Sequence, residues 1–385
     1  MYIRNASASK IIEYMFLGGC LALMYLLAGS SLQLFAQSDL NLAEPLKKCR
    51  VYGGNNGIAR IIASDNVRNL ILTNDNFSVI SMNLDFGTET ENWKTLSGGY
   101  LESQAIDTEN LFLVTSFENV DRKKSYILNS ISLGTGITNW QLKINEHYKV
   151  LINEIADEKV LILMIDDTRL MAVSKDAGKI IWTKEYIEKI VDVNKSVSDL
   201  EELYILSGNG LTNIQKNSGQ IINEFKFKSK EISIGVIGRS FVLNGYPTGD
   251  IIRVSIGAIQ NDVIWKIKAG GGISGLVPYK DEILVTSLDN FIYLYSIENG
   301  KLRWKRRVAG RINIEPRIYG DLAIVLNSGN NAASVIDLRD GKVINQIQVE
   351  EETYFTGQPF VLGKYLIFQT SKGIYFFSGT NQACK

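Results

Sequence analysis

The chain is poor in the residue types that most often build catalytic and metal centres. Its 385 residues include one histidine, three cysteines and five prolines. A single histidine excludes a histidine cluster for a metal ion and a repeated set of acid and base groups. That histidine, His147, lies in the polar stretch NEHYKV, and we interpret it as a surface residue. The sequence therefore predicts no catalytic, metal or cofactor site and no enzyme.

The chain also lacks a charge excess and any long helical pattern. Forty-one Lys and Arg balance forty-one Asp and Glu, which argues against a nucleic-acid partner. Two acidic pairs, Asp166-Asp167 and Asp281-Glu282, fall where β-turns favour acids, so we interpret them as turns rather than metal ligands. The Gly-rich stretch Ala269–Ser274 is followed by no Lys-Ser/Thr, and we assign it to the end of a repeat rather than to a phosphate loop.

What the sequence does contain is a repeated hairpin. In Ser287–Gly310, an apolar strand-like run precedes Asn299-Gly300, and a second run with Trp304 follows. Asn and Gly tolerate the positive φ of a tight reversal. Because an isolated hairpin cannot bury both faces, we expect neighbouring copies to cover it.

The repeat has a period of about forty residues. A glycine four residues before a tryptophan recurs, and asparagine takes the tryptophan position in two copies. Strand-like repeats of this length are typical of a β-propeller with one four-stranded sheet per repeat. The repeat positions are Trp93, Trp140, Trp182, Asn223, Trp265, Trp304 and Asn345.

The two ends of the repeat region predict one more blade. Three strand-like runs follow the last full repeat, at Gly357–Leu362, Tyr365–Gln369 and Gly373–Ser378. The missing fourth strand is predicted at Leu46–Gly54. The sequence therefore predicts an all-β, eight-bladed propeller over residues 45–385, closed by the N-terminal strand joining the C-terminal three.

The N-terminus resembles an export signal. A start with two cations precedes the largely apolar stretch Ile11–Ala36, which predicts a secretory signal over residues 1–36 and a polar linker over 37–44. An uncleaved membrane anchor is the alternative, because about twenty apolar residues can span a bilayer. Leu17–Cys20 also resembles a lipoprotein cleavage motif, so Cys20 is a possible lipidation site.

Export gives the remaining cysteines a possible role. Cys49 and Cys384 both belong to the predicted closing blade, and an oxidising compartment would allow a disulfide between them. Two free thiols are the alternative.

The repeat resembles that of quinoprotein-type propellers, as in SIENGKLRWK, KDAGKIIWTK and LRDGKVINQI. Within that group, Leu46–Ser378 most resembles the BamB family, the propeller subunit of the bacterial outer-membrane β-barrel assembly machinery. The resemblance implies a non-catalytic periplasmic scaffold without a cofactor, which assists the folding and insertion of outer-membrane barrels. It also implies a monomer within a complex, associated with the outer membrane through its partner or an anchor.

The resemblance further implies a partner site. The family binds the periplasmic domains of the machinery's central barrel component through an inter-blade loop with an apolar-x-apolar-Arg pattern. Here Val191, Val193 and Asn194 take those positions, so the arginine is absent. Alternatively, the two valines belong to the first strand of the next blade.

Two other functions stay open. An exported propeller that binds a peptide, a glycan or the cell wall would carry its function in loops. A quinone-dependent dehydrogenase shares the repeat, but that family's vicinal cysteine pair is missing here.

Overall fold

A computed structural model describes residues 40–379 of the chain except for short segments. The chain divides into two compact units, Met1–Phe35 and Ala36–Lys385. The expected signal over residues 1–36, with Cys20, lies outside the described residues, as do His147 and Cys384. Among the described residues, no helix has the length and apolar character needed to cross a membrane. The segments not described within 40–379 are 53–59, 65–68, 74–77, 84–89, 119–123, 145–148, 156–158, 196–201, 209, 227–233, 238–240, 256–262 and 328–330.

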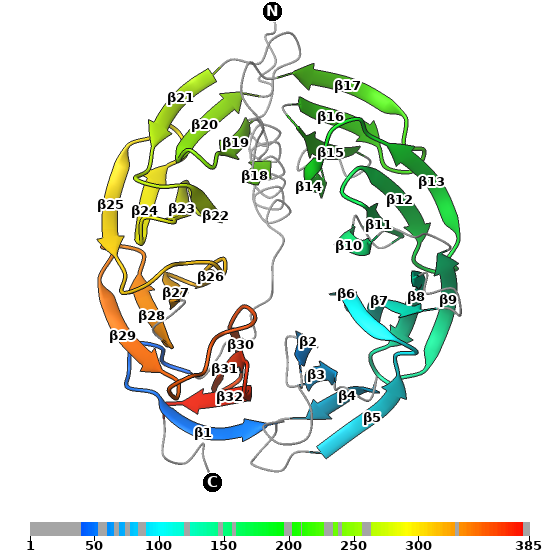
Figure 1. Cartoon of the computed structure of the whole chain (residues 1–385), viewed down its shortest axis with the longest axis horizontal. Coiled ribbons are helices and arrows are strands. Elements are labelled where there is room, and N and C mark those ends of the chain that lie inside the picture. The colour runs from blue at the N-terminus through cyan, green and yellow to red at the C-terminus, as the bar shows by residue number, and fades with distance from the viewer. Residues whose placement is uncertain are drawn as a thin grey trace, which may run out of the picture. The chain divides into compact units, whose positions relative to one another are not determined.

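Within the second unit, the described strands form eight four-stranded sheets that follow one another around a ring (Figure 1). In seven sheets the four strands are consecutive in the chain, and neighbouring strands pair antiparallel. The first four of these sheets consist of β2 (Arg60–Ser64), β3 (Asn69–Thr73), β4 (Ser78–Asn83) and β5 (Thr90–Leu96); β6 (Tyr100–Ile106), β7 (Asn110–Glu118), β8 (Lys124–Ser132) and β9 (Thr138–Ile144); β10 (Val150–Ile155), β11 (Val160–Ile165), β12 (Arg169–Ser174) and β13 (Ile180–Glu185); and β14 (Ile190–Lys195), β15 (Glu202–Ser207), β16 (Gly210–Gln215) and β17 (Ile221–Lys226).

The other four sheets complete the second half of the described chain. One of them combines distant parts of the sequence, because β1 pairs antiparallel with β32. These sheets consist of β18 (Ile234–Ile237), β19 (Phe241–Gly245), β20 (Asp250–Ser255) and β21 (Val263–Lys268); β22 (Ile273–Tyr279), β23 (Glu282–Ser287), β24 (Phe291–Ser296) and β25 (Leu302–Arg307); β26 (Arg317–Tyr319), β27 (Leu322–Asn327), β28 (Ala332–Asp337) and β29 (Val343–Gln348); and β30 (Phe360–Leu362), β31 (Tyr365–Thr370), β32 (Gly373–Ser378) and β1 (Lys47–Tyr52).

The hydrophobic core lies between neighbouring sheets. The second and third strands of a blade, such as β11 and β12, are apolar on both faces and almost wholly buried. The fourth strands, such as β13 and β25, lie at the outer edge, where exposed and partly buried residues alternate. Because each sheet is covered on both faces by its neighbours, the inner strands are continuous apolar runs.

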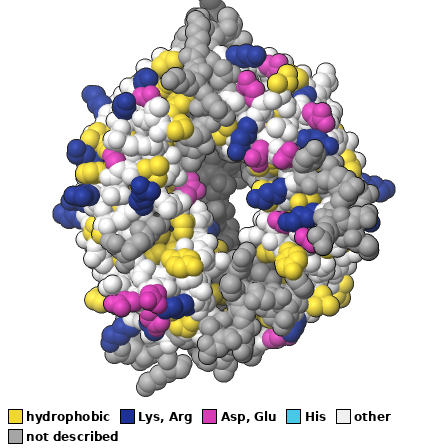
Figure 2. Space-filling view, in the orientation of Figure 1, with side chains coloured by type: hydrophobic (Ala, Val, Ile, Leu, Met, Phe, Trp, Pro, Cys, Tyr) yellow, Lys and Arg dark blue, Asp and Glu magenta, His cyan; other side chains and the backbone are white. Residues whose placement is uncertain are grey.

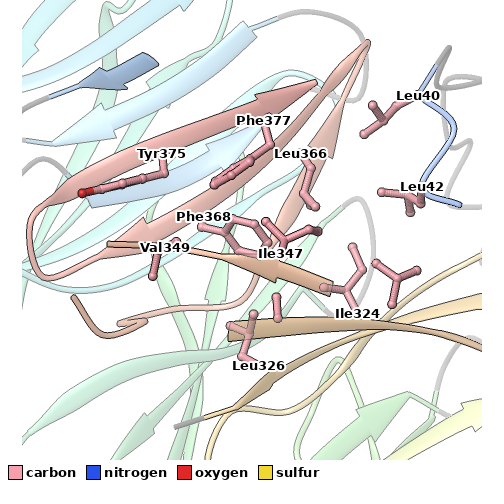
Figure 3. Packing of buried hydrophobic residues seen from close by; sticks show 12 residues of the cluster. Leu40, Leu42, Ile324, Leu326, Ile347, Val349, Leu366, Phe368, Tyr375 and Phe377 are labelled. Carbon is pink, nitrogen blue, oxygen red and sulfur yellow. The ribbon is translucent and has the colours of Figure 1, made fainter. Parts of the chain in front are cut away.

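The segment expected as a polar linker contributes to this core. Leu40 and Leu42 are buried and join a cluster that includes Ile324 and Leu366 from two neighbouring sheets (Figure 3). Within the segment predicted as a polar linker, these two leucines alternate with polar residues and face the protein rather than water.

Each tryptophan of the repeat packs on the next blade. A Cβ atom added to Gly178 would lie 2.4 Å from the indole of Trp140, and one added to Gly300 would lie 2.9 Å from that of Trp265. These turn glycines also have positive φ, 63° and 69°, which glycine adopts without strain. The motif of glycine and tryptophan therefore joins two repeats: a tryptophan contacts the glycine of the following one.

A hydrogen bond accompanies every one of these contacts. The indole Nε1–H donates to a backbone carbonyl three residues before the contacted glycine, at 2.6–2.9 Å. The buried edge of each indole thus keeps a partner for its only donor. The donor and acceptor pairs are Trp93 and Leu133, Trp140 and Lys175, Trp182 and Lys216, Trp265 and Ile297, and Trp304 and Leu338.

Asn345 makes a related contact where the next sheet is the one that contains β1. Its side-chain amide donates to the carbonyls of Leu42 at 3.1 Å and Glu44 at 2.6 Å. Asn41 shapes this segment, because its side chain accepts from the backbone N–H of Ala43. The N-terminal segment therefore occupies the place that a turn takes in other blades.

A nearly buried ion pair also links two blades. Lys175 and Asp107 approach to 2.5 Å, with side chains 6% and 17% exposed. Burial by itself raises the pKa of Asp107, but hydrogen bonds from Lys175 and from the backbone N–H groups of Glu109 and Asn110 lower this pKa overall. The folded protein therefore favours the ionised carboxylate.

We expect Gly178→Ala to destabilise the protein more than Gly320→Ala. Both glycines have positive φ, 63° and 60°, but nothing lies within 4 Å of a Cβ at Gly320. The backbone cost of about 1–2 kcal/mol is therefore shared, and overpacking against Trp140 adds about 1–3 kcal/mol at Gly178 only. Urea unfolding measures the difference. Equal losses for the two variants would show that the indole contact tolerates a methyl group.

We expect Asp107→Asn to lower the free energy of unfolding by about 3 kcal/mol at pH 7, because Lys175 loses its buried partner. A lowered folded-state pKa stabilises the protein above the unfolded value of about 4 and ceases to do so as pH falls through the folded value. The difference between wild type and variant should therefore shrink below about pH 4. Urea unfolding at several pH values tests this, and a pH-independent difference would contradict it.

Candidate partner-binding face

One face of the blades is formed by the turns between second and third strands and by the connections from one sheet to the next, and we call it the connection face. Backbone hydrogen bonds join these two kinds of segment. Tyr186 donates to Thr168 at 2.7 Å, and Val308 donates to Asn290 at 2.9 Å. The opposite face carries the glycine turns that receive the tryptophans, so the connection face is the one left for contacts outside the ring.

The structure places Val191, Val193 and Asn194 in β14, the first strand of a sheet. Val191 is partly buried and packs against a cluster that contains Leu206 and Tyr246. The two valines therefore belong to the first strand of the next blade, as the alternative interpretation of the sequence predicted. Contact of these three residues with a partner stays a prediction.

The exposed apolar residue of this inter-blade segment is Ile187, which the sequence analysis did not select. Ile187 is 102% exposed and lies in the connection Tyr186–Lys189, which we call the Ile187 loop. The signal in the sequence was weak: one isoleucine among charged residues between two strands. A fully exposed isoleucine on the connection face is a candidate contact residue.

Backbone hydrogen bonds hold the Ile187 loop at both ends. At one end Tyr186 donates to Thr168 at 2.7 Å. At the other end Ile190 donates to Asp167 at 2.6 Å, and Gly208 donates to Lys189 at 2.8 Å. Lys189 also pairs with Asp167 at 3.1 Å. A loop fixed in this way presents its tip with little ordering cost on binding.

The acidic pair Asp166-Asp167 forms the turn that supports this loop. Both residues have positive φ, 52° and 55°, as expected for a tight hairpin turn. Within the loop, Tyr186 is partly buried, and burial raises the pKa of its hydroxyl. These groups therefore serve to shape the loop, and the surface at its tip is the apolar Ile187 flanked by Glu188 and Lys189.

Other large apolar residues are exposed on the same face. Leu96 and Tyr100 flank the connection between β5 and β6, and Leu288 lies in the turn between β23 and β24. Tyr354 lies in the connection from β29 to β30. Their side chains are 47–72% exposed, so exposed apolar residues recur at several blades on this face.

Of the two cysteines predicted to form a disulfide, the structure describes only Cys49. Cys49 lies at a β-bulge in β1 and takes part in a disulfide. Cys384 lies outside the described residues, so the pairing of these two cysteines stays a prediction. Among the described residues, no group of three or more His, Cys, Asp or Glu is placed to hold a metal ion.

Comparison with known proteins identifies a related family. Residues 251–378 match the sequence model of a family described as outer membrane protein assembly factor BamB. No curated protein matches the chain by sequence. The matched region runs from β20 to β32.

Three solved structures share the fold. BamB from Moraxella catarrhalis superposes with a TM-score of 0.60 and 11% identity over 87% of this chain and 98% of that chain. The computationally designed Ika8 protein gives 0.68 and 8% over 86% and 99%, and the Pan2 WD40 domain of Neurospora crassa gives 0.52 and 14% over 74% and 90%. Identities this low show the fold alone. The comparisons therefore show the propeller fold, together with sequence similarity to the BamB family over residues 251–378.

We expect Val191→Asp to destabilise the fold and Ile187→Asp to leave it unchanged. A carboxylate at Val191 would enter the cluster around Leu206 without a partner and cost about 3 kcal/mol or more. The same change at the exposed Ile187 should stay within about 0.5 kcal/mol of wild type. Thermal unfolding of the two variants makes the comparison. A stable Val191→Asp protein would mean that this side chain is not a core residue.

Proposed function

We propose that this protein is a non-catalytic scaffold that binds a component of the outer-membrane barrel assembly machinery through its connection face. The observation that carries the proposal is Ile187, a fully exposed isoleucine on a loop held by backbone hydrogen bonds at both ends. An apolar side chain in this position gains free energy when a partner removes it from water.

The family match supports the choice of partner class. Proteins described as BamB are assembly factors of the outer membrane, and this chain carries their sequence pattern over residues 251–378. The place of action in this proposal is the periplasm, beside the outer membrane. The partner is the central barrel component of the machinery, bound through its periplasmic domains.

The contact differs from the family pattern in one respect. Asn194 stands where the family pattern has arginine, so an ion pair from that position is absent. In our proposal the apolar contact moves to Ile187, and the flanking Glu188 and Lys189 provide charge of both signs. The interface is therefore less dependent on salt than one built on a buried arginine pair.

We expect Ile187→Asp to reduce recovery of an outer-membrane barrel protein with the tagged full-length chain by about thirtyfold, because a hot-spot residue contributes about 2 kcal/mol. The measurement is affinity purification from solubilised membranes, followed by quantification of the barrel protein. Ile137→Asp is the matched control, since Ile137 is 66% exposed but lies in a turn on the opposite face.

The control should retain the partner, and both variants should melt like wild type. Undiminished recovery with Ile187→Asp would reject the loop as the contact. If no barrel protein is recovered with wild type, the proposed function itself fails.

A further inference from the structure

The outer edge of one blade carries an unusual row of cations. In β25, Arg303, Lys305 and Arg307 occupy alternate, exposed positions, while Trp304 and Arg306 between them are partly buried. Side chains at alternate positions of a strand lie on one face, about 7 Å apart. The chain as a whole is neutral, so this row is a local concentration of charge.

Among the seven outer strands that carry the Trp or Asn of the repeat, only β25 has three cations in this row. The equivalent positions are Asn92, Lys94 and Leu96 in β5; Asn139, Gln141 and Lys143 in β9; Ile181, Thr183 and Glu185 in β13; Ile222, Glu224 and Lys226 in β17; Ile264, Lys266 and Lys268 in β21; and Ile344, Gln346 and Gln348 in β29. Seven strands with the same backbone role therefore differ in this property, and the fold does not require it. Figure 2 shows Lys and Arg side chains along the left flank, where Figure 1 places β25.

The charge of the row is only partly compensated. Arg303 donates a hydrogen bond to Glu282 at 2.6 Å. Lys305 lies over the ring of Phe291 with its nitrogen 5.7 Å from the centroid, which leaves its charge without a counter-ion there. Among the described residues, no carboxylate pairs with Lys305 or Arg307.

A groove of about 350 Å³ lies at the end of this row. Arg307 lines it on the β25 side, and Val343 and Gln346 of the next blade line the other side. Asn290, Val308, Ala309 and the buried Ser334 complete the lining, and none of the described residues in it is acidic. The groove thus combines one guanidinium with apolar walls, two amides and a hydroxyl.

We propose that the outward row of β25 and the adjoining groove bind an extended, acidic polypeptide segment. An extended chain repeats its side chains at the same 7 Å or so as the row of cations, so alternate carboxylates would face Lys305 and Arg307 in register. The amides and the hydroxyl of the groove suit peptide groups, and the valines suit methylene carbons. A compact anion would use one cation of the row, and a flat lipid surface would not enter the groove.

The inference is independent of docking through the Ile187 loop. The probe is a fluorescein-labelled peptide in which Glu and Ser alternate, and its binding to the full-length protein is measured by fluorescence anisotropy. We expect binding that weakens as salt is raised and that falls by about tenfold in the double variant Lys305→Glu/Arg307→Glu.

The matched control is the double variant Lys226→Glu/Lys268→Glu, which changes the net charge equally on two other outer strands. It should bind the peptide within about twofold of wild type, as should Ile187→Asp. All the substituted side chains are exposed, and the melting temperature of each variant is measured first to check its fold. A peptide of the same composition with its glutamates contiguous at one end should bind more weakly.

Three results would overturn the proposal. Equal losses in the two double variants would indicate attraction by net charge alone. Equal binding of the two peptides would remove the role of spacing. Binding of anionic phosphatidylglycerol vesicles that depends on Lys305 and Arg307, without binding of the peptide, would assign the row to a lipid surface instead.

Discussion

The contact between a tryptophan and the turn glycine of the next blade is the interaction on which this architecture depends. It places a large apolar plate against a backbone that has no side chain, and it uses the indole N–H to satisfy a carbonyl of the same turn. Since a four-stranded sheet cannot bury both faces alone, the contact also sets how closely and at what position the next sheet covers it. All five tryptophans of the chain are used in this way.

The contacts of the tryptophans lead to a difference between two faces of the protein. The face with the glycine turns holds the contacts that join blades, including the Lys175–Asp107 pair and the hydrogen bond from Tyr279 to Asp321. On the connection face and on the outer strands, the exposed side chains take no part in these contacts, so they can change without loss of the ring. Ile187 and the cations of β25 both lie on these less constrained surfaces.

The repeat made much of the strand order predictable, because glycine and tryptophan recur at one offset and inner strands are apolar throughout. The partner of each tryptophan was less visible, since its glycine lies in the following copy and not four residues away. Val191 shows another limit. A bulge between Ile190 and Asp192 breaks the two-residue alternation, so the pattern Val-x-Val could not tell which side chain faces the core.

The exposure of Ile187 was beyond sequence reasoning for a different reason. It depends on the path of a short loop fixed by hydrogen bonds to Thr168 and Asp167, and backbone acceptors leave no signature in side-chain identity. Leu40 and Leu42 were missed because a polar stretch with two leucines resembles a linker until the cluster around Ile324 is seen.

Asn223 and Asn345 take the place of tryptophan in two blades, and this has a consequence for how the ring would yield under load. An asparagine offers hydrogen bonds but little apolar area. These two junctions between blades therefore lack the indole that resists separation at the five junctions with a tryptophan. Under pulling force, or in a cell that threads the chain into a protease, opening would begin at these junctions and release blades in groups. The three sheets from β18 to β29 would then leave as one intact block, because Trp265 and Trp304 fasten the two junctions inside it.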